Sequence, residues 1–435
     1  MVALKTEQSK RVRTFAIVLT NPAVRQINHL GVDRARQNID SRSVSASAPR
    51  LADCAGRGYS ACCARCNRGD LDGLVDTVIV KIHDEAGRYG FGETDAPPDV
   101  VKAFIETQTA HAWSRNIPEI LVGADPIETS ALWQRMYEGT FWHGRRGLGL
   151  HAIGALDVAL HDLAGKQRGL PAYKLMGGAR RPDLEPYCTI FPGLANGRSL
   201  ATLMREIGRQ FEMALKTGFR AVKMEVLFYD LVTDAELVAS IHEGRRMLGD
   251  GITMALDFGY RWKSWHDARW VLERIADCNI YFAEATLQHD DLEGHARLAA
   301  VSPIRICGAE AAAGRHEVRE WIERGKVAVV QPNITRSGGL TEMRRIADMA
   351  DLAGIQVIPH GWKTGITSAA GRHFQAACPA VPYFEYVSPQ VFDNVLRREL
   401  TSPEATLKDG KMELPSEPGL GIALNEDLVS RFRVD

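Results

Sequence analysis

A series of short apolar segments, whose polar ends lie between Val222 and Glu385, constrains the fold of this chain more than any other feature. In chain order the segments read AVKMEV, ITMALDF, IYFAEAT, IRICGAE, VAVVQPN, IQVIPHGW and PYFEYVS. Each is rich in β-branched residues, and the polar ends recur roughly every 25 residues, the length of one strand, one helix and two loops. The spacing predicts an α/β fold with a TIM-like (β/α)7–8 barrel.

The polar ends of these segments are expected to meet, because the C-terminal ends of parallel barrel strands all face the same way. They are Lys223, Glu225, Asp257, Glu284, Glu310, Gln331, Asn333, His360 and Glu385. Asp257, Glu284 and Glu310 end successive segments and offer only carboxylate oxygens, the ligands that suit Mg²⁺. Without a cation they would repel one another. We therefore predict a Mg²⁺ site there; the alternative is that each carboxylate only caps the next helix.

A barrel of about 250 residues leaves room in this chain of 435 residues for a second unit. VDTVIVKIHDEAGRYGFGE reads as a β-hairpin with its turn at 85–87. A long amphipathic helix follows and closes at Gly169, before Pro171. We predict an α+β capping domain over residues 1–182, the barrel over 183–395, and a tail over 396–435 that packs on the capping domain.

Other elements follow from local patterns. Val12–Leu19 and PYCTI read as strands, Asp409-Gly410 as a hairpin turn, and Gly218 as a helix C-cap. We expect His151 and His161, both on the long helix, to be surface or core residues rather than ligands. Helices are predicted near Val100–Arg115, Ile127–Tyr137, Leu200–Thr217, Asp234–Leu248, Ser264–Ala276, Asp291–Ala299, Arg315–Arg324, Thr341–Ala353 and Gly365–Ala377.

Residues 25–69 differ from the rest of the chain. They are crowded with Arg, Ser, Ala and Cys and show neither helical nor strand periodicity. Cys63 and Cys66 form half of a zinc knuckle, but a closed structural zinc site needs four ligands. We interpret the segment as a poorly packed or disordered loop, or as a stretch translated out of register.

Composition excludes several classes of protein. The formal charge of −1 gives no reason to expect a nucleic-acid partner, and no apolar run is long enough to span a membrane. The N-terminus lacks the apolar core of a signal peptide, and the eight cysteines then read as reduced thiols. We expect a cytoplasmic enzyme that forms a homo-oligomer.

Beyond Val75 most of the chain resembles the enolase superfamily, mandelate racemase subgroup. VIVKIHDEAGRYGFGE is similar to its capping hairpin, and LDFGYRW, FAEA, GAE, VVQPNITRSGGLTE, PHGW and EPGLGI are similar to its barrel signatures. The resemblance implies that Asp257, Glu284 and Glu310 bind an essential Mg²⁺. It also implies loss of a proton from the α-carbon of a carboxylate substrate, with the enediolate held by Mg²⁺, Lys223 and Glu385.

Two positions depart from the family pattern. The second-strand motif is often Lys-x-Lys, whose second lysine is a base, whereas here it reads Lys223-Met224-Glu225. The aspartate that usually orients the catalytic histidine is Asn333 here. An amide can orient the ring of His360 but adds no charge, so His360 should be a weaker base than its counterparts.

These departures bear on the reaction. Racemisation needs acid–base groups on both faces of the enediolate, whereas His360 alone can remove the α-proton and protonate the departing β-hydroxyl in a syn elimination. We therefore predict a lyase, an acid-sugar dehydratase that yields a 2-keto-3-deoxy acid, with Lys363 as a further substrate-binding residue. A racemase, epimerase or cycloisomerase with Glu225 or Lys223 as second base stays open. So does a catalytically silent relative.

Overall fold

The computed structural model describes residues 12–19, 77–108, 112–195, 197–378, 380–392 and 394–434. All of these belong to one compact unit of the chain. The anomalous stretch 25–69, including the half zinc knuckle, lies outside the described residues.

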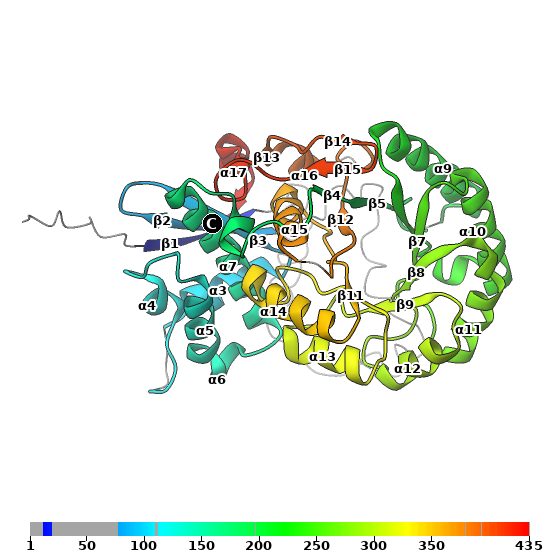
Figure 1. Ribbon diagram of the computed structural model, residues 1–435, viewed down its shortest axis with the longest axis horizontal. Coiled ribbons are helices and arrows are strands. Elements are labelled where there is room, and N and C mark those ends of the chain that lie inside the picture. The colour runs from blue at the N-terminus through cyan, green and yellow to red at the C-terminus, as the bar shows by residue number, and fades with distance from the viewer. Residues whose placement is uncertain are drawn as a thin grey trace, which may run out of the picture. The chain divides into compact units, whose positions relative to one another are not determined.

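An antiparallel sheet begins the capping domain, in the order β17-β1-β2-β3 (Figure 1). Its strands are β1 (Val12–Leu19), β2 (Thr77–Asp84), β3 (Tyr89–Thr94) and β17 (Arg433–Val434). The carboxylate of Asp84 accepts hydrogen bonds from the backbone N–H groups of Ala86 and Arg88, which fixes the turn between β2 and β3. Both the predicted N-terminal strand and the predicted hairpin are confirmed.

Helices cover one face of this sheet. They are α3 (Pro98–Glu106), α4 (Ile117–Leu121), α5 (Thr129–Gly139), α6 (Phe141–Gly144), α7 (Leu148–Arg168) and α8 (Ala172–Leu175). β3 approaches the backbone of α7 so closely that a Cβ at Gly92 would lie 2.0 Å from the carbonyl oxygen of Ala155. The long helix ends on left-handed Gly169, as predicted.

One helix prediction was too long. The helix expected to reach Arg115 ends at Glu106, because Thr107 adopts an extended conformation. Asn116 then caps a separate helix, α4, by accepting a hydrogen bond from the N–H of Glu119.

Eight parallel strands form the barrel: β5 (Pro186–Ile190), β6 (Ala221–Glu225), β7 (Thr253–Asp257), β8 (Ile280–Glu284), β9 (Arg305–Gly308), β10 (Val329–Val330), β11 (Gln356–Val357) and β12 (Phe384–Tyr386). From β5 to β11 each strand pairs with the next along the chain, and β12 pairs with β5. A hydrogen bond of 3.3 Å from the N–H of Glu385 to the carbonyl of Pro359 links the remaining edges. The predicted TIM-like barrel with a capping domain is confirmed.

Helices alternate with the strands and lie outside them (Figure 1). They are α9 (Leu200–Thr217), α10 (Asp234–Leu248), α11 (Trp265–Arg274), α12 (Leu292–Val301), α13 (Arg315–Glu323), α14 (Gly339–Leu352) and α15 (Gly365–Ala377). The limits of α9, α10 and α15 match the prediction because Ser199, Thr233 and Thr364 cap their N-termini. A short 3₁₀ helix, η4 (Ala276–Cys278), precedes β8.

The interior of the barrel is a packed apolar layer below the strand ends. It consists of Tyr187, Ala221, Ala255, Phe282, Cys307, Val329 and Ile358. A solvent-filled channel is therefore absent at this level of the described barrel. The polar side chains at the strand ends pack against this apolar layer.

The C-terminal segment contacts the capping elements. It contains α16 (Val395–Glu399), β13 (Thr401–Ser402), β14 (Leu407–Lys408), β15 (Lys411–Glu413), β16 (Ala423–Leu424) and α17 (Glu426–Phe432). Asp409-Gly410 forms the predicted turn between β14 and β15. Glu426 binds Lys81 of β2 at 2.6 Å, and the N–H of Leu420 donates to Asp162 of α7 at 2.8 Å.

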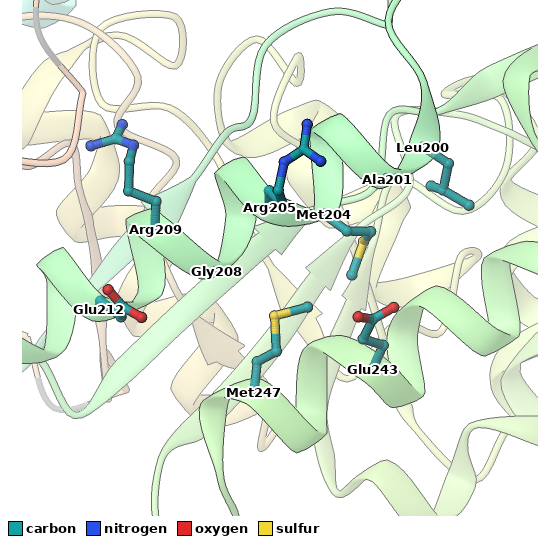
Figure 2. A pocket seen from close by; sticks show the side chains of 9 residues that line it. All are labelled: Leu200, Ala201, Met204, Arg205, Gly208, Arg209, Glu212, Glu243 and Met247. Carbon is teal, nitrogen blue, oxygen red and sulfur yellow. The ribbon is translucent and has the colours of Figure 1, made fainter.

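A groove between α9 and α10 holds none of the predicted site residues (Figure 2). It is lined by Leu200, Ala201, Met204, Arg205, Gly208, Arg209, Glu212, Glu243 and Met247. In the described part of the chain, every helix is too short or too polar to span a lipid bilayer.

Candidate active site

The second barrel strand directs two polar side chains toward the interior. Met224 packs outward, and a Cβ added to Gly244 of α10 would lie 2.8 Å from its sulfur. Because side chains alternate along a strand, Lys223 and Glu225 face inward. Both are buried, at 1% and 9% exposure.

Lys223 is the centre of an ionic cluster. Its Nζ lies 2.7 Å from Glu284 and 3.0 Å from Glu385, and Asp257 follows at 3.6 Å. Burial alone would lower the pKa of this ammonium group, but Glu284 and Glu385 raise it well above its usual value. The surrounding carboxylates therefore favour the charged form of Lys223.

The carboxylates near Lys223 exceed what one lysine can neutralise. Burial raises the pKa of Asp257 to about 6, and it raises the pKa of Glu284 and of Glu225 well above the usual value. The buried Oε1 of Glu284 has no hydrogen-bond partner in the described structure. An excess of carboxylates and an unsatisfied oxygen fit a cation site with hard ligands.

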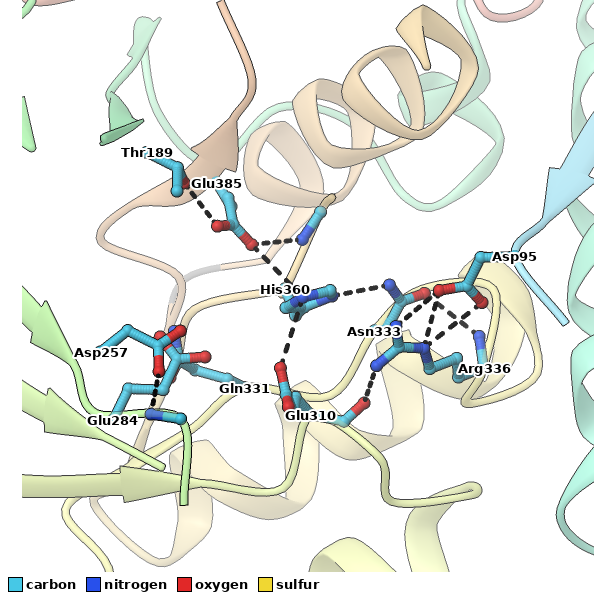
Figure 3. Close-up of polar contacts among 12 residues, drawn as sticks. Asp95, Thr189, Asp257, Glu284, Glu310, Gln331, Asn333, Arg336, His360 and Glu385 are labelled. Carbon is cyan, nitrogen blue, oxygen red and sulfur yellow. Dashed lines mark hydrogen bonds and ion pairs between the residues drawn. The ribbon is translucent and has the colours of Figure 1, made fainter. Parts of the chain in front are cut away.

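Glu310 lies toward the histidine side of the site (Figure 3). The hydroxyl of Tyr260 donates to its Oε1, and Nε2 of His360 lies 3.3 Å from its Oε2. The oxygens of Asp257, Glu284 and Glu310 do not all lie within 4.8 Å of one another. The donor set is thus of the right chemistry for Mg²⁺, while its members are also paired with protein donors.

Glu385 is held rigidly between Lys223 and the loop after β11. It accepts hydrogen bonds from the hydroxyl of Thr189 at 2.5 Å and from the N–H of Gly361 at 2.7 Å. Burial would raise its pKa, but the charge of Lys223 lowers it to about 2. Glu385 is therefore an anion that positions Lys223.

The amide of Asn333 determines how His360 is held. Its Oδ1 accepts hydrogen bonds from the N–H and hydroxyl of Thr335 and from the N–H of Arg336. Only Nδ2 is then left to face Nδ1 of His360, 2.9 Å away (Figure 3). Since Nδ2 is a donor, Nδ1 must accept, and a neutral His360 carries its proton on Nε2. Burial also lowers the pKa of His360, which favours this neutral form.

Arg336 and Asp95 join the barrel to the capping domain beside His360, and sequence reasoning missed both. Arg336 binds Asp95 at 2.5 Å and donates to the backbone carbonyl of Glu310 at 3.3 Å. Burial would raise the pKa of Asp95, but Arg336 lowers it to about 2. Arg336 stands in the quoted motif QPNITRSGG and Asp95 directly follows the capping hairpin, which were the available signals.

Two further predictions can be placed relative to Asp95. Lys363 is half-buried after His360, and its charge contributes to the lowered pKa of Asp95. His151, with Nδ1 3.8 Å from Asp95, lies at the edge of the site, and burial lowers its pKa to about 4. His161 is buried and bonded to the carbonyl of Asp157, as expected for a core residue.

Comparison with known proteins gives matches to two family profiles. The profile described as "Enolase C-terminal domain-like" matches residues 206–428, which is more than half of the chain. The profile described as "Mandelate racemase / muconate lactonizing enzyme, N-terminal domain" matches residues 74–177. The two profiles correspond to the barrel and to the capping elements.

Individual relatives fall into more than one class of enzyme. D-galactarolactone cycloisomerase of Agrobacterium fabrum is 28% identical over 367 residues, 82% of this chain and 91% of that protein. L-rhamnonate dehydratase of Saccharopolyspora erythraea is 28% identical over 376 residues, 83% of this chain and 86% of that protein. The crystal structure of a candidate racemase is 46% identical, with a TM-score of 0.79, and covers 82% of this chain and 93% of its own.

Proposed function

The chain belongs to the mandelate racemase/muconate lactonizing enzyme family of the enolase superfamily, and from this premise we propose that it is a Mg²⁺-dependent acid-sugar dehydratase. The relatives' names support a dehydratase or an isomerase of sugar acids. The choice of dehydration depends on the proton positions in the site.

Asp257, Glu284 and Glu310 would hold the Mg²⁺, which supplies Lewis-acid stabilisation of the charge that develops on a substrate carboxylate. The unsatisfied Oε1 of Glu284 supports this assignment. Lys223, fixed by Glu284 and Glu385, adds a second positive charge at the same place. Lys363 is the candidate for binding a distal polar group of the substrate.

His360 is proposed to donate a hydrogen bond from Nε2–H to the departing hydroxyl oxygen. To act as a base, His360 would need a free lone pair on Nε2. The amide of Asn333 donates to Nδ1, so the ring proton of neutral His360 stays on Nε2. Moving that proton to Nδ1 would require the amide to turn over and break the three hydrogen bonds on Oδ1. The geometry therefore supports a role for His360 at the departing hydroxyl and argues against removal of the α-proton by this ring.

Glu225 is proposed as the acceptor of the α-proton. It stands where Lys-x-Lys relatives carry their second lysine, and it faces the site from β6. Around the barrel β6 is separated from β11 by β5 and β12, so Glu225 and His360 approach from different sides. A carboxylate in a buried environment is a stronger base than one in water.

The reaction then balances with these two groups and solvent. The α C–H bond breaks and its proton moves to the carboxylate of Glu225. The Cβ–O bond breaks while Nε2–H of His360 hydrogen-bonds to the departing oxygen, which takes a proton from solvent and leaves as water. The resulting enol tautomerises to a 2-keto-3-deoxy acid, and Glu225 releases its proton to solvent.

The hydrogen bond from Asn333 to His360 is the observation that carries this conclusion. Racemisation requires each flanking group both to accept and to donate a proton, whereas elimination requires one acceptor and one donor. A His360 ring that keeps its proton on Nε2 can donate but not accept there, which fits elimination and not racemisation.

The proposal is tested by incubating the protein and Mg²⁺ with a panel of aldonic and aldaric acids. We expect a keto product lighter than its substrate by one water. A product of unchanged mass from an open-chain acid would contradict dehydration and indicate an epimerase.

A cycloisomerase is the second candidate, supported by the relative from Agrobacterium fabrum, matched over 91% of its length. Opening a lactone ring needs the same acceptor and donor, with the ring oxygen as leaving group. Adding sugar lactones to the panel separates the two functions, because ring opening by elimination changes the structure but not the mass.

A further inference from the structure

A second cluster of potential metal ligands lies away from the proposed active site. It consists of His242 on α10 with Asp277 and Cys278 on η4. Among the described residues, this is the one set of three His, Cys, Asp or Glu side chains whose ligand atoms all lie within 4.8 Å of one another. Cys278 precedes β8 and Glu284 ends it, so the two clusters stand about 20 Å apart at a rise of about 3.3 Å per residue.

The imidazole of His242 is already oriented as a ligand. Its Nε2 lies 3.0 Å from the carbonyl oxygen of Arg274, to which it donates in the neutral ring. The lone pair of Nδ1 then points at Sγ of Cys278, 3.3 Å away. A metal-bound histidine usually donates its other N–H to a carbonyl or carboxylate in this way, which fixes the tautomer.

The distances between donor atoms match a tetrahedral centre. Zinc bonds of about 2.0–2.3 Å to nitrogen, oxygen and sulfur place neighbouring ligands about 3.3–3.7 Å apart. Nδ1 of His242 and Sγ of Cys278 meet this spacing, and Oδ1 of Asp277 lies 4.0 Å from the sulfur. The side chain of Asp277 is 77% exposed, so it is free to close the remaining gap.

Hydrogen bonds from Arg245 hold the backbone that carries Asp277 and Cys278. Arg245 of α10 donates to the carbonyl oxygens of Cys278 at 2.7 Å, Asn279 at 3.2 Å, and both Gly249 and Ile252 at 2.9 Å. All of these hydrogen bonds are accepted by main-chain carbonyl oxygens. The side chains of Asp277 and Cys278 are therefore not used by Arg245 and lie near His242. A preorganised loop of this kind reduces the entropy lost when a ligand set closes on a metal.

We propose that His242, Asp277 and Cys278 form a zinc site, with water as the fourth ligand. A thiolate and a carboxylate together neutralise a divalent cation, and a thiolate, imidazole and carboxylate set favours zinc over Mg²⁺. Because the cluster lies at the N-terminal end of the strands, the metal braces α10 against η4 and takes no part in the reaction.

The test uses Co²⁺ as a spectroscopic probe of the full chain, with excess Mg²⁺ to fill the proposed active site. We expect one equivalent of Co²⁺ to give a thiolate charge-transfer band and tetrahedral visible bands, both displaced by Zn²⁺. Cys278→Ser and His242→Gln should lose this signal, whereas Cys378→Ser, which removes another buried cysteine, should keep it.

Difference spectra between variants remove any contribution from other cysteines of the chain. If Cys278→Ser does not fold, His242→Gln and Asp277→Asn still decide the matter, since both side chains reach solvent. A Co²⁺ spectrum that is the same in wild type, His242→Gln and Asp277→Asn would overturn the proposal, and so would a wild type without a thiolate band.

Discussion

The two halves of the proposed active site are held by different forces. Around Lys223, one buried cation faces Glu284, Glu385 and Asp257 within 3.6 Å. Around His360, a neutral ring is held at 2.9 Å by the neutral amide of Asn333. Charge fixes the first half, and the direction of a hydrogen bond fixes the second.

The difference shows which changes each half tolerates. In the Lys223 half, removing a charge leaves buried partners uncompensated, so stability and metal binding should respond. In the His360 half, one atom exchanged between Asn and Asp leaves packing alone but reverses the donor and acceptor roles. Substitutions in the His360 half should change the tautomer and pKa of His360 more than they change the stability of the protein.

Lys223→Met is expected to have the largest effect. It leaves three buried carboxylates without their cation, and breaking a buried ion pair costs about 3–5 kcal/mol. We expect a large fall in thermal stability together with loss of activity. Lys81→Met is the matched control, because Lys81 is also buried and ion-paired but lies in β2. It should lose stability and keep activity; equal activity losses in both variants would contradict the role of Lys223.

Glu284→Gln is expected to have the second-largest effect. It removes one negative charge near Lys223 without creating a cavity. The amide keeps the shape but removes a ligand charge, so we expect titration calorimetry to show no stoichiometric Mg²⁺ binding. Glu342→Gln serves as control, since Glu342 is equally buried but pairs with Arg315 and Arg345. Tight Mg²⁺ binding retained by Glu284→Gln would show that the metal is held elsewhere.

Asn333→Asp tests the His360 half. In the wild type, burial keeps the pKa of His360 below its usual value, so the ring stays neutral at lower pH. A carboxylate at 333 would accept from Nδ1–H and favour the imidazolium, raising this pKa by roughly 1–3 units. In the variant the neutral ring would carry its proton on Nδ1, so Nε2 would donate only below this pKa. We expect activity to fall on the basic side of the pH–rate profile, with little change in melting temperature. An unmoved profile would argue against control of His360 by residue 333.

Asp95→Asn should have the smallest effect. The folded-state pKa of about 2 lies below the unfolded value, so Asp95 adds stability that is present above about pH 4. That stability is lost as the pH falls toward 2. The shift corresponds to roughly 2 kcal/mol. Melting curves of Asp95→Asn should lie below those of the wild type at pH 7 and converge with them as the pH falls to about 2; parallel curves would show that the ion pair with Arg336 is not responsible.

The sequence was sufficient for the parts of the fold that are determined locally. Side-chain caps and glycine stops lie beside the helices they end, which is why α9 was predicted with its limits at Leu200 and Thr217, directly before Gly218. The helix expected to reach Arg115 was too long because an apolar pattern does not reveal that Thr107 turns to an extended conformation.

For the candidate site too, the sequence predicted some features and missed others. Strand spacing alone brought Asp257, Glu284 and Lys223 together, because a barrel repeats its strand ends at regular intervals. The contact between Asp95 and Arg336 joins residues 241 positions apart, and no local pattern indicates it. The orientation of the Asn333 amide depends on backbone donors of the next turn, which a sequence does not display.

The central claim is that Glu225 accepts the α-proton and that Nε2–H of His360 donates a hydrogen bond to the departing hydroxyl. It is tested most directly by solvent deuterium exchange. Substrate and product are analysed for wild type, Glu225→Gln and His360→Asn with the same sugar acid. We predict exchange and water loss in the wild type, neither in Glu225→Gln, and exchange without water loss in His360→Asn. Loss of exchange in His360→Asn with retention in Glu225→Gln would contradict the assignment, and no exchange in the wild type with any acid would contradict enolate chemistry altogether.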